Sequence, residues 1–237
     1  MLKVLAIIPA RGGSRSIPRK NLALLDGKPL IAHTIAVARS VPEIDRIVVS
    51  TDSPDIAAAA RRCGAETPFL RPAELARDDT PGIDPLIHAV QWLAQHEGYR
   101  PDYVLCLQPT SPLRNVGDIR QALRVAAERD AEAVVSVVPV KHHPYWTRRI
   151  EPDGRLVDFL PDNPEVARRQ DLPPAYALNG AVYLMRYDIL MQRRTWQTDR
   201  TYALVMPPER SIDIDTPLDL DLAALLLARG RREEGVV

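Results

Sequence analysis

Short apolar runs alternate with segments of helical period along most of this chain, and that alternation limits the folds it can adopt. The runs that read as strands cover residues 3–9, 46–51, 66–70, 102–107 and 132–138. The helical segments cover residues 29–39, 54–62, 85–97, 116–129 and about 217–229. Strands that alternate with helices pair in parallel, so the pattern predicts an α/β fold with a largely parallel sheet flanked by helices. The 237 residues are enough for a single domain over 1–237.

Three polar side chains come directly after predicted strands. Arg11 follows the first strand, Asp52 follows the second, and Gln108 follows the strand over 102–107. In an open α/β sheet, ligands bind outside the carboxyl ends of the strands. We therefore expect these side chains to share one edge of the sheet and the functional site to lie there.

A glycine-rich basic loop follows the first strand. Two adjacent glycines, Gly12 and Gly13, break the apolar run, and four arginine or lysine side chains lie within residues 11–20. Glycines let a backbone approach phosphate oxygens closely, and arginine and lysine supply the compensating charge. The loop matches neither the dinucleotide-binding glycine pattern nor the Walker lysine loop. Its residues alone leave two interpretations open: a phosphate-binding loop or a solvent-exposed basic loop.

Charge is balanced over the whole chain but not along it. The 31 basic and 31 acidic residues cancel, so no overall field draws the protein to nucleic acid or to a membrane surface. Residues 1–28 carry six basic side chains and one acid, whereas residues 207–221 carry five acids and one arginine. If the fold brings these two segments together, they suit a polyphosphate and its metal ion.

The acidic segment contains a pair of aspartates that alternate around an apolar residue. In an extended backbone, Asp213 and Asp215 face one way and Ile214 faces the core. Two hard oxygen ligands on one side suit Mg²⁺, which takes carboxylates together with substrate phosphates and water. A helix cap competes with this interpretation, because Thr216 and Asp219 have the spacing of a capping box. Capping does not account for Asp213.

The alternation stops at residue 139. Residues 139–178 are rich in proline, arginine and aromatic side chains, and strands resume over 180–186 and 202–206. The interruption is too long for a structureless loop inside a compact domain. We therefore expect an excursion, over about 140–178, that packs on a partner subunit in a homodimer.

The sequence has no segment typical of a membrane span or a cleaved leader. The apolar stretch over 4–8 is too short for a signal peptide, and no run approaches the roughly 20 apolar residues that cross a bilayer. We therefore expect a cytoplasmic protein. Cys63 and Cys106 have neither disulfide nor metal-ligand spacing, and the apolar neighbours of Cys106 predict a buried free thiol.

Four blocks of the chain resemble the CMP-sialic acid synthetase (acylneuraminate cytidylyltransferase) family, in the same order and over nearly the whole length. They are the opening loop, Gln108-Pro109-Thr110-Ser111-Pro112-Leu113-Arg114, Asn179-Gly180-Ala181-Val182-Tyr183 and Asp213-Ile214-Asp215-Thr216. The resemblance implies a Rossmann-like nucleotidyltransferase fold with a small dimerisation excursion. It also implies Mg²⁺-dependent transfer of CMP from CTP to the anomeric hydroxyl of a sialic-acid-like nonulosonate, a 2-keto sugar acid, with release of pyrophosphate.

The resemblance implies a role for individual residues as well. The implied catalytic residues are Arg11, Lys20 and Gln108. The implied nucleotide-binding residues are Arg11, Gly12, Gly13, Ser14, Arg15, Lys20, Asn21 and Arg71. The implied substrate-binding residues are Gln108, Thr110, Ser111, Lys141, Arg169, Asn179 and Tyr183, and the metal ligands are Asp213 and Asp215. Among these, Arg169 corresponds best to the arginine that binds the sugar carboxylate, and Arg168 is the alternative.

Some of these positions have a second interpretation or depart from the family. Asn21 fits a nucleotide contact and a brace of the loop equally well, and the prolines around Gln108 also fit a rigid strand exit. Arg15 and Ser16 replace the family's usual lysine and glycine, and Gly82 stands where a small hydroxyl often helps to read cytosine. We nominate no side-chain general base.

Two other functions remain open from the sequence. One is a nucleotidyltransferase of the same fold that activates a different sugar or a sugar phosphate. The other is a non-catalytic module that binds sugar nucleotides. The carboxylates of Asp213 and Asp215 argue against the second, because binding a sugar nucleotide does not by itself require a pair of metal ligands.

Overall fold

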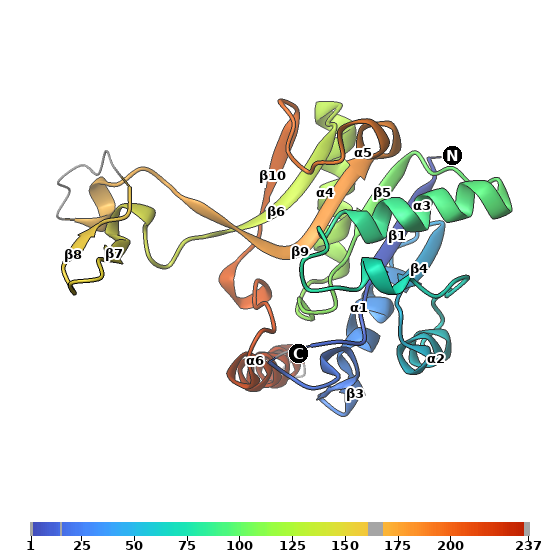
Figure 1. Cartoon of the computed structure of the whole chain (residues 1–237), viewed down its shortest axis with the longest axis horizontal. Coiled ribbons are helices and arrows are strands. Elements are labelled where there is room, and N and C mark those ends of the chain that lie inside the picture. The colour runs from blue at the N-terminus through green and yellow to red at the C-terminus, as the bar shows by residue number, and fades with distance from the viewer. Residues whose placement is uncertain (1, 15, 161–167, 235–237) are drawn as a thin grey trace.

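A six-stranded sheet forms the centre of the computed structural model, which describes residues 2–14, 16–160 and 168–234 (Figure 1). The strand order is β10-β6-β9-β5-β1-β4. These strands are β1 Val4–Pro9, β4 Arg46–Ser50, β5 Tyr103–Cys106, β6 Ala133–Pro139, β9 Tyr176–Arg186 and β10 Thr201–Val205. All pairs are parallel except those of β9, which runs antiparallel to β5 and β6. The prediction of an α/β fold with a largely parallel sheet is confirmed.

Helices cover both faces of this sheet. They are α1 Leu30–Arg39, α2 Pro54–Arg62, α3 Asp84–Glu97, α4 Val116–Arg129, α5 Tyr187–Arg193 and α6 Pro217–Glu234. Strand β1 shows why both faces of the sheet are covered by helices. Ile8 packs in the core with α1, α2 and α4, and Ile7 packs on the other face with α3 and α5. A strand buried on both faces reads as a continuous apolar run, which is the pattern at the N-terminus of the chain.

Local signals fix where several helices begin. The Ser53 hydroxyl accepts a hydrogen bond from the Ile56 amide at 3.4 Å, and Pro54 takes the first helical position of α2, as the sequence predicts. Helix α4 begins with a reciprocal capping box between Asn115 and Asp118. These caps set the ends of helices whose preceding loops lie at the carboxyl edge of the sheet.

The prediction of a strand over 66–70 is wrong. Only Glu66 makes a bridge, with Val48 of β4, and the chain then leaves the sheet. Pro68 has no amide hydrogen to donate to a ladder, which limits this segment to a single bridge. Strand β9 also begins earlier than predicted, at Tyr176, because its first residues pair with the far end of β6.

Residues 140–160 and 168–175 form an arm that stands away from the body (Figure 1). The arm contains the antiparallel hairpin of β7 Arg148–Ile150 and β8 Leu156–Asp158. At its base, the Val140 amide donates to the Ala175 carbonyl at 3.0 Å, which continues the pairing of β6 with β9. Several large apolar side chains of the arm are open to solvent, among them Ile150 at 72% and Leu156 at 66% exposed.

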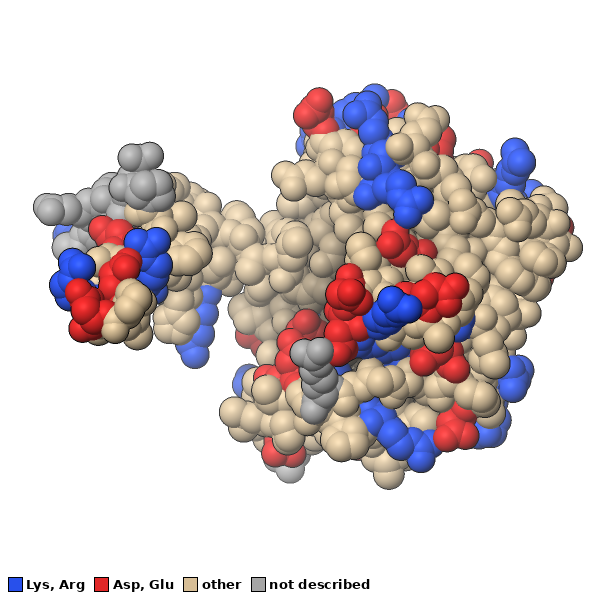
Figure 2. All heavy atoms as spheres, in the orientation of Figure 1, with Lys and Arg blue, Asp and Glu red and all other residues tan. Residues whose placement is uncertain are grey.

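The surface of the body mixes both signs of charge. On the face shown in Figure 2, aspartate and glutamate side chains gather near the middle of the body beside a basic side chain, and a separate group of basic side chains lies above them. In the described parts of the chain, no helix is both long and apolar enough to cross a membrane.

Candidate active site

The glycine-rich loop is held to the carboxyl ends of β1 and β4 by specific hydrogen bonds. The Gly12 amide donates to an Asp52 carboxylate oxygen at 2.8 Å, and the Asn21 side-chain amide donates to the Arg11 carbonyl at 2.9 Å. A Cβ at Gly12 would lie 3.1 Å from the Cβ of Ser53, so a larger residue would force a shift of the loop or of Ser53. Asn21 therefore braces the loop and also lines the smaller of two cavities beside it.

The basic loop and the acidic segment meet in the fold, although they lie nearly two hundred residues apart. The ammonium of Lys20 donates to the Ile214 carbonyl at 2.7 Å and to a carboxylate oxygen of Asp215 at 3.1 Å. The Lys20 side chain is only 15% exposed, whereas that of Asp215 is 74% exposed. The two segments singled out by charge thus form one site.

The acidic segment keeps the predicted alternation without joining the sheet. Ile214 is fully buried, and its amide donates to the Thr110 carbonyl at 2.7 Å. Surrounding protein atoms raise the pKa of Asp213 from its ordinary value, a hydrogen bond from Thr110 opposes that shift, and the charge of Asp215 adds to it. The two carboxylates beside a lysine are oxygen groups of the chemical type that hard cations prefer.

The helix cap and the carboxylate pair use different residues. The Thr216 amide donates to the Asp219 carboxylate at 2.6 Å, and the Thr216 hydroxyl donates to the same oxygen at 2.8 Å. This capping arrangement occupies Thr216 and Asp219 and uses neither the Asp213 nor the Asp215 carboxylate. Among the described residues, no cluster of three or more histidine, cysteine or acidic side chains is arranged around a common metal position.

Gln108 stands between two cavities at the carboxyl edge of the sheet. It lines both the smaller cavity of about 320 Å³ and the larger one of about 880 Å³. A Cβ at Gly180 would lie 3.0 Å from the Gln108 side-chain oxygen and 3.7 Å from an Asp213 oxygen, and Gly180 has φ +71°. Strand β9 therefore passes directly under these side chains at a residue that must be glycine.

The smaller cavity belongs to the loop. It is lined by Pro9, Arg11, Gly13, Ser14, Ser16, Lys20, Asn21, Gln108, Pro109, Thr110 and Asp215. Of the predicted nucleotide-binding residues of the loop, Arg15 lies outside the described residues, and Gly12 acts through its amide on Asp52. Backbone groups, two cations and one carboxylate therefore surround a space suited to phosphate oxygens.

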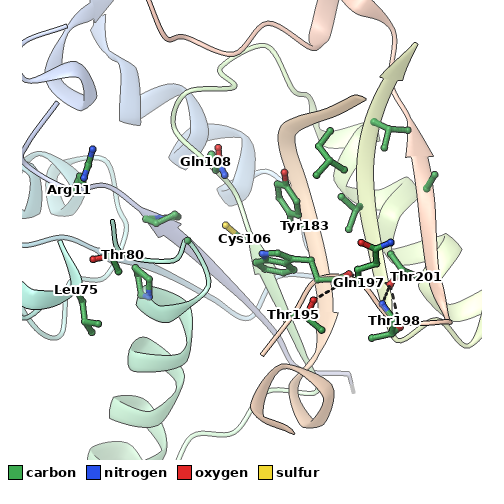
Figure 3. A pocket seen from close by; sticks show the side chains of 18 of the residues that line it. Arg11, Leu75, Thr80, Cys106, Gln108, Tyr183, Thr195, Gln197, Thr198 and Thr201 are labelled. Atoms are coloured by element: carbon green, nitrogen blue, oxygen red, sulfur yellow. Dashed lines mark hydrogen bonds between the residues drawn. The ribbon is translucent and has the colours of Figure 1, made fainter. Parts of the chain in front are cut away.

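The larger cavity has a cationic end and a neutral end (Figure 3). At the cationic end Arg11 pairs with Asp78 at 2.6 Å, and Arg71 lies buried. The Arg71 guanidinium donates to the Ser50 hydroxyl at 3.0 Å. Burial lowers the pKa of Arg71 to about 10; the charge of Asp52 opposes this shift and the charge of Arg11 adds to it. Arg71 thus holds the end of β4 and keeps a cation at the cavity wall.

Of the residues at the neutral end, the sequence singled out only Tyr183, as a substrate contact. Trp196 packs on Tyr183 with ring centroids 5.0 Å apart, and both line the cavity. The rest of this end carries hydroxyl, amide or apolar groups from β6, β9, β10 and the loop before β10: Val135, Val137, Leu178, Thr195, Gln197, Thr198, Thr201, Tyr202 and Ala203. No charged side chain belongs to this set, which suits a neutral polyol or an acylated sugar. Only tertiary packing places the loop residues here.

Three predicted sugar contacts do not line the two cavities, and their role stays a prediction. The Asn179 amide is buried, donates to the Ser211 hydroxyl at 2.9 Å and accepts from the Ser136 hydroxyl at 2.6 Å. Ser111 is also buried and donates to the Asn179 carbonyl at 3.3 Å. Asn179 thus braces the junction of β6 and β9, and Ser111 ties the turn after β5 to β9. Lys141 is exposed at the root of the arm.

The remaining predictions are placed as follows. The side chain of Arg169 lies outside the described residues. Cys106 is a buried free cysteine, as predicted, and burial raises the pKa of its thiol to about 12, so it stays protonated at the floor of the larger cavity. Thr110 lines the smaller cavity and donates to Asp213.

Comparison with known proteins agrees with this geometry. A family model for cytidylyltransferases matches residues 5–226. The CMP-N,N'-diacetyllegionaminic acid synthase of Legionella pneumophila is 40% identical over 233 residues, which cover 95% of this chain and 97% of that protein. The N-acylneuraminate cytidylyltransferase of Streptococcus agalactiae serotype V is 36% identical over 217 residues, which cover 91% of this chain and 51% of that protein.

A solved structure shares the fold at lower sequence identity. It is a CMP:2-keto-3-deoxy-manno-octonic acid synthetase complexed with CTP, with a TM-score of 0.70, 20% identity, and coverage of 96% of this chain and 99% of that one. Since the family match spans nearly the whole chain, it includes the loop, Gln108 and the aspartate pair together. This chain is a nucleotidyltransferase of the cytidylyltransferase family and belongs with the CMP-sialic acid synthetases.

Proposed function

We propose that this protein transfers CMP from CTP to the anomeric hydroxyl of a sialic-acid-like nonulosonate and releases pyrophosphate. The observation that carries the proposal is the contact of Lys20 with Asp215, which joins a phosphate-type loop to a carboxylate pair beside Gln108. The two relatives described above are named for CMP transfer to legionaminic and neuraminic acids. The two cavities that meet at Gln108 give room for a nucleotide and a sugar acid.

The chemistry is a displacement at phosphorus. The anomeric oxygen forms a bond to the α-phosphorus of CTP, the bond from that phosphorus to the pyrophosphate oxygen breaks, and the hydroxyl proton leaves to solvent. Negative charge grows on the phosphate oxygens and on the leaving pyrophosphate. Arg11, Lys20 and the loop amides are fixed near this charge, so they stabilise the transition state more than the ground state.

Cytidylyltransferases of this kind use a divalent metal ion, and we propose Mg²⁺. Asp213 and Asp215 would hold it, because both carboxylates flank a buried residue and the adjacent helix cap uses neither of them. When bound, the ion neutralises phosphate charge and lowers the pKa of the attacking hydroxyl. Gln108 orients the sugar from the junction of the cavities, which supplies the positioning part of catalysis.

We also propose a homodimer in which the arm of each protomer lies against the other. In its own chain Lys141 lines neither cavity, and the arm exposes Ile150, Leu156 and Phe159. A partner would bury this apolar surface and bring the arm's cations toward a sugar carboxylate. Light scattering at micromolar concentration should give a dimer, and replacing Ile150 and Leu156 with aspartate should give a monomer. A wild-type monomer would contradict the arrangement.

Pyrophosphate release tests the proposed function. The assay combines each of CTP, UTP, GTP and ATP with neuraminate, legionaminate, pseudaminate and an ordinary sugar phosphate, and mass spectrometry identifies the nucleotide sugar. Release with CTP and a nonulosonate supports the proposal, whereas release only with a sugar phosphate supports the other enzyme class. Nucleotide binding without release would indicate a binding module.

We propose a cytoplasmic location, where CTP is made; recovery of the protein in a membrane or external fraction would contradict it.

A further inference from the structure

Arg114 is the largest fully buried side chain of the described residues, with 2% of its surface exposed. One nitrogen of its guanidinium, Nη2, donates to the Ser111 carbonyl at 2.8 Å, to the Gln108 carbonyl, and to the Thr34 hydroxyl at 3.2 Å. A single guanidinium thus donates hydrogen bonds to carbonyls at both ends of the turn that follows β5. Thr34 lies in α1, so Arg114 also fixes the turn to the helix layer.

The sequence of this turn explains why a side chain is needed there. Pro109 and Pro112 have no amide hydrogen, so backbone hydrogen bonds cannot close the turn at those positions. The one backbone bond across the turn, from the Ser111 amide to the Gln108 carbonyl, is 3.3 Å long. The guanidinium of Arg114 supplies the donors that the prolines lack.

The same turn is the meeting point of the site's other parts. The Thr110 carbonyl accepts from the Ile214 amide at 2.7 Å, and the Thr110 hydroxyl donates to Asp213. On the other side, Gly180 of β9 runs below the Gln108 side chain. A shift of the turn would therefore move Gln108 and the aspartate segment together, relative to the glycine-rich loop.

The arrangement is energetically expensive for a purely structural brace. The Nε and Nη1 groups of Arg114 are buried and have no hydrogen-bond partner among the described residues. A buried cation with unsatisfied donors costs stability, and an apolar residue of similar volume would avoid that cost. Burial lowers the pKa of Arg114 to about 10, and the carboxylates of Asp118 and Asp213 act against this shift. The positive charge thus persists at neutral pH behind the aspartate pair.

We propose that Arg114 is a positioning residue for the transfer reaction: it holds the turn over 108–112 so that Gln108 and the segment of Asp213 address the same reacting centre. The inference rests on the proposed function for its kinetic consequence, but the geometry of the turn can be measured without turnover. It predicts a selective loss of chemistry rather than of nucleotide binding, because Arg114 lines neither of the two cavities.

The test compares three variants of the full chain. Arg114→Met keeps an unbranched stem as far as the position of Nε and removes the charge and the donors. Arg114→Lys keeps a cation, and Arg120→Met changes an exposed arginine that pairs with Glu43 at 2.7 Å. We expect Arg114→Met to lower kcat by about 10- to 100-fold, the scale of a small misplacement in an active site. The dissociation constant for CTP, measured by calorimetry, should change by less than about threefold. Arg114→Lys should recover part of kcat, and Arg120→Met should match wild type.

Hydrogen exchange provides the second readout. In Arg114→Met the amides of a peptide spanning 107–115 should exchange faster than in wild type, and those in Arg120→Met should not. If Arg114→Met fails to fold, Arg114→Lys decides with the same readouts: a lowered kcat, unchanged CTP affinity and faster exchange at the turn are expected.

Two results would overturn the inference: a normal kcat with unchanged exchange at the turn, or a loss of CTP binding as large as the loss of kcat. If wild type releases no pyrophosphate with any nonulosonate, the proposed function fails instead. The exchange of the turn in the Arg114 variants still decides whether Arg114 holds it, because that measurement needs no substrate.

Discussion

The ammonium of Lys20 lies 3.1 Å from a carboxylate oxygen of Asp215 and 2.7 Å from the Ile214 carbonyl. This contact joins the glycine-rich loop after the first strand to the acidic segment before the last helix. A triphosphate on the loop and a metal ion on the aspartates would therefore be neighbours. If the proposed roles hold, the phosphate-binding loop and the metal ligands would act as one unit.

Lys20→Met should lower kcat by about 100-fold, because a fixed cation at developing phosphate charge contributes on that scale. The matched control is Arg19→Met, since Arg19 is in the same loop but pairs with Asp55 at 2.6 Å in solvent. Steady-state pyrophosphate release measures both. Equal effects of the two substitutions would show that only the total charge of the loop matters.

Asp213→Asn should raise the Mg²⁺ concentration needed for half-maximal turnover by about tenfold or more. Asp221→Asn changes an exposed carboxylate of α6 and serves as the control. Metal titrations of pyrophosphate release separate the two variants. An unchanged titration for Asp213→Asn would assign this carboxylate a structural role.

The same substitution should stabilise the metal-free protein. The pKa of Asp213 is raised in the folded state because protein atoms displace water around the carboxylate. The folded state then holds the proton up to a higher pH than the unfolded state, so ionisation at neutral pH costs folding stability. Thermal unfolding in EDTA at neutral pH should give a higher Tm for Asp213→Asn than for wild type, and a lower Tm would contradict this reasoning.

Gly180→Ala should lower kcat beyond what its loss of folding stability explains. Its Cβ would lie 3.0 Å from the Gln108 side-chain oxygen, and φ +71° adds a backbone cost of about 1 kcal/mol or more. Gly154→Ala is the matched control, because Gly154 has φ +86° with open space around the position of a Cβ. If both variants lose a similar amount of Tm but only Gly180→Ala loses kcat, the contact with the Gln108 side chain, and not the backbone strain, lowers the activity. Normal kcat in Gly180→Ala would show that the Gln108 side chain has room to move.

Asp78→Asn should tighten CTP binding by a few fold, about the scale of a partly exposed ion pair. In the structure Arg11 pairs with Asp78 at 2.6 Å, so a triphosphate must compete with that carboxylate. Calorimetric titration with CTP measures the change, and Asp55→Asn, which affects the Arg19 pair, is the control. Weaker CTP binding would mean that Asp78 itself contacts the nucleotide or its metal.

The sequence was informative where function and fold depend on local pattern. The apolar run that contains Ile7 and Ile8 predicts a strand buried on both faces, and the structure places these side chains in separate cores. The alternation of Asp213, Ile214 and Asp215 predicts a buried isoleucine between two carboxylates, which the structure has. Both predictions depend on period two of an extended chain, which needs no tertiary information.

Other features depend on tertiary packing and could not be predicted from the sequence. Asn179 has the residue type of a sugar contact, but β9 inserts between β5 and β6 and its amide is used within that junction. Trp196 reaches the larger cavity only because the loop before β10 folds over Tyr183. Neither position has a periodic signal. The role of Arg114 emerges only when the carbonyls of Gln108 and Ser111 are seen to converge on one nitrogen.

If CTP and a nonulosonate react at the site joined by Lys20 and Asp215, phosphorus NMR of the wild-type protein with CTP, Mg²⁺ and a diacetylated legionaminate should detect both products. We expect pyrophosphate and a new CMP phosphodiester to appear in equal amounts, and neither to form in EDTA. Unchanged CTP, or pyrophosphate formed together with free CMP and no phosphodiester, would contradict it.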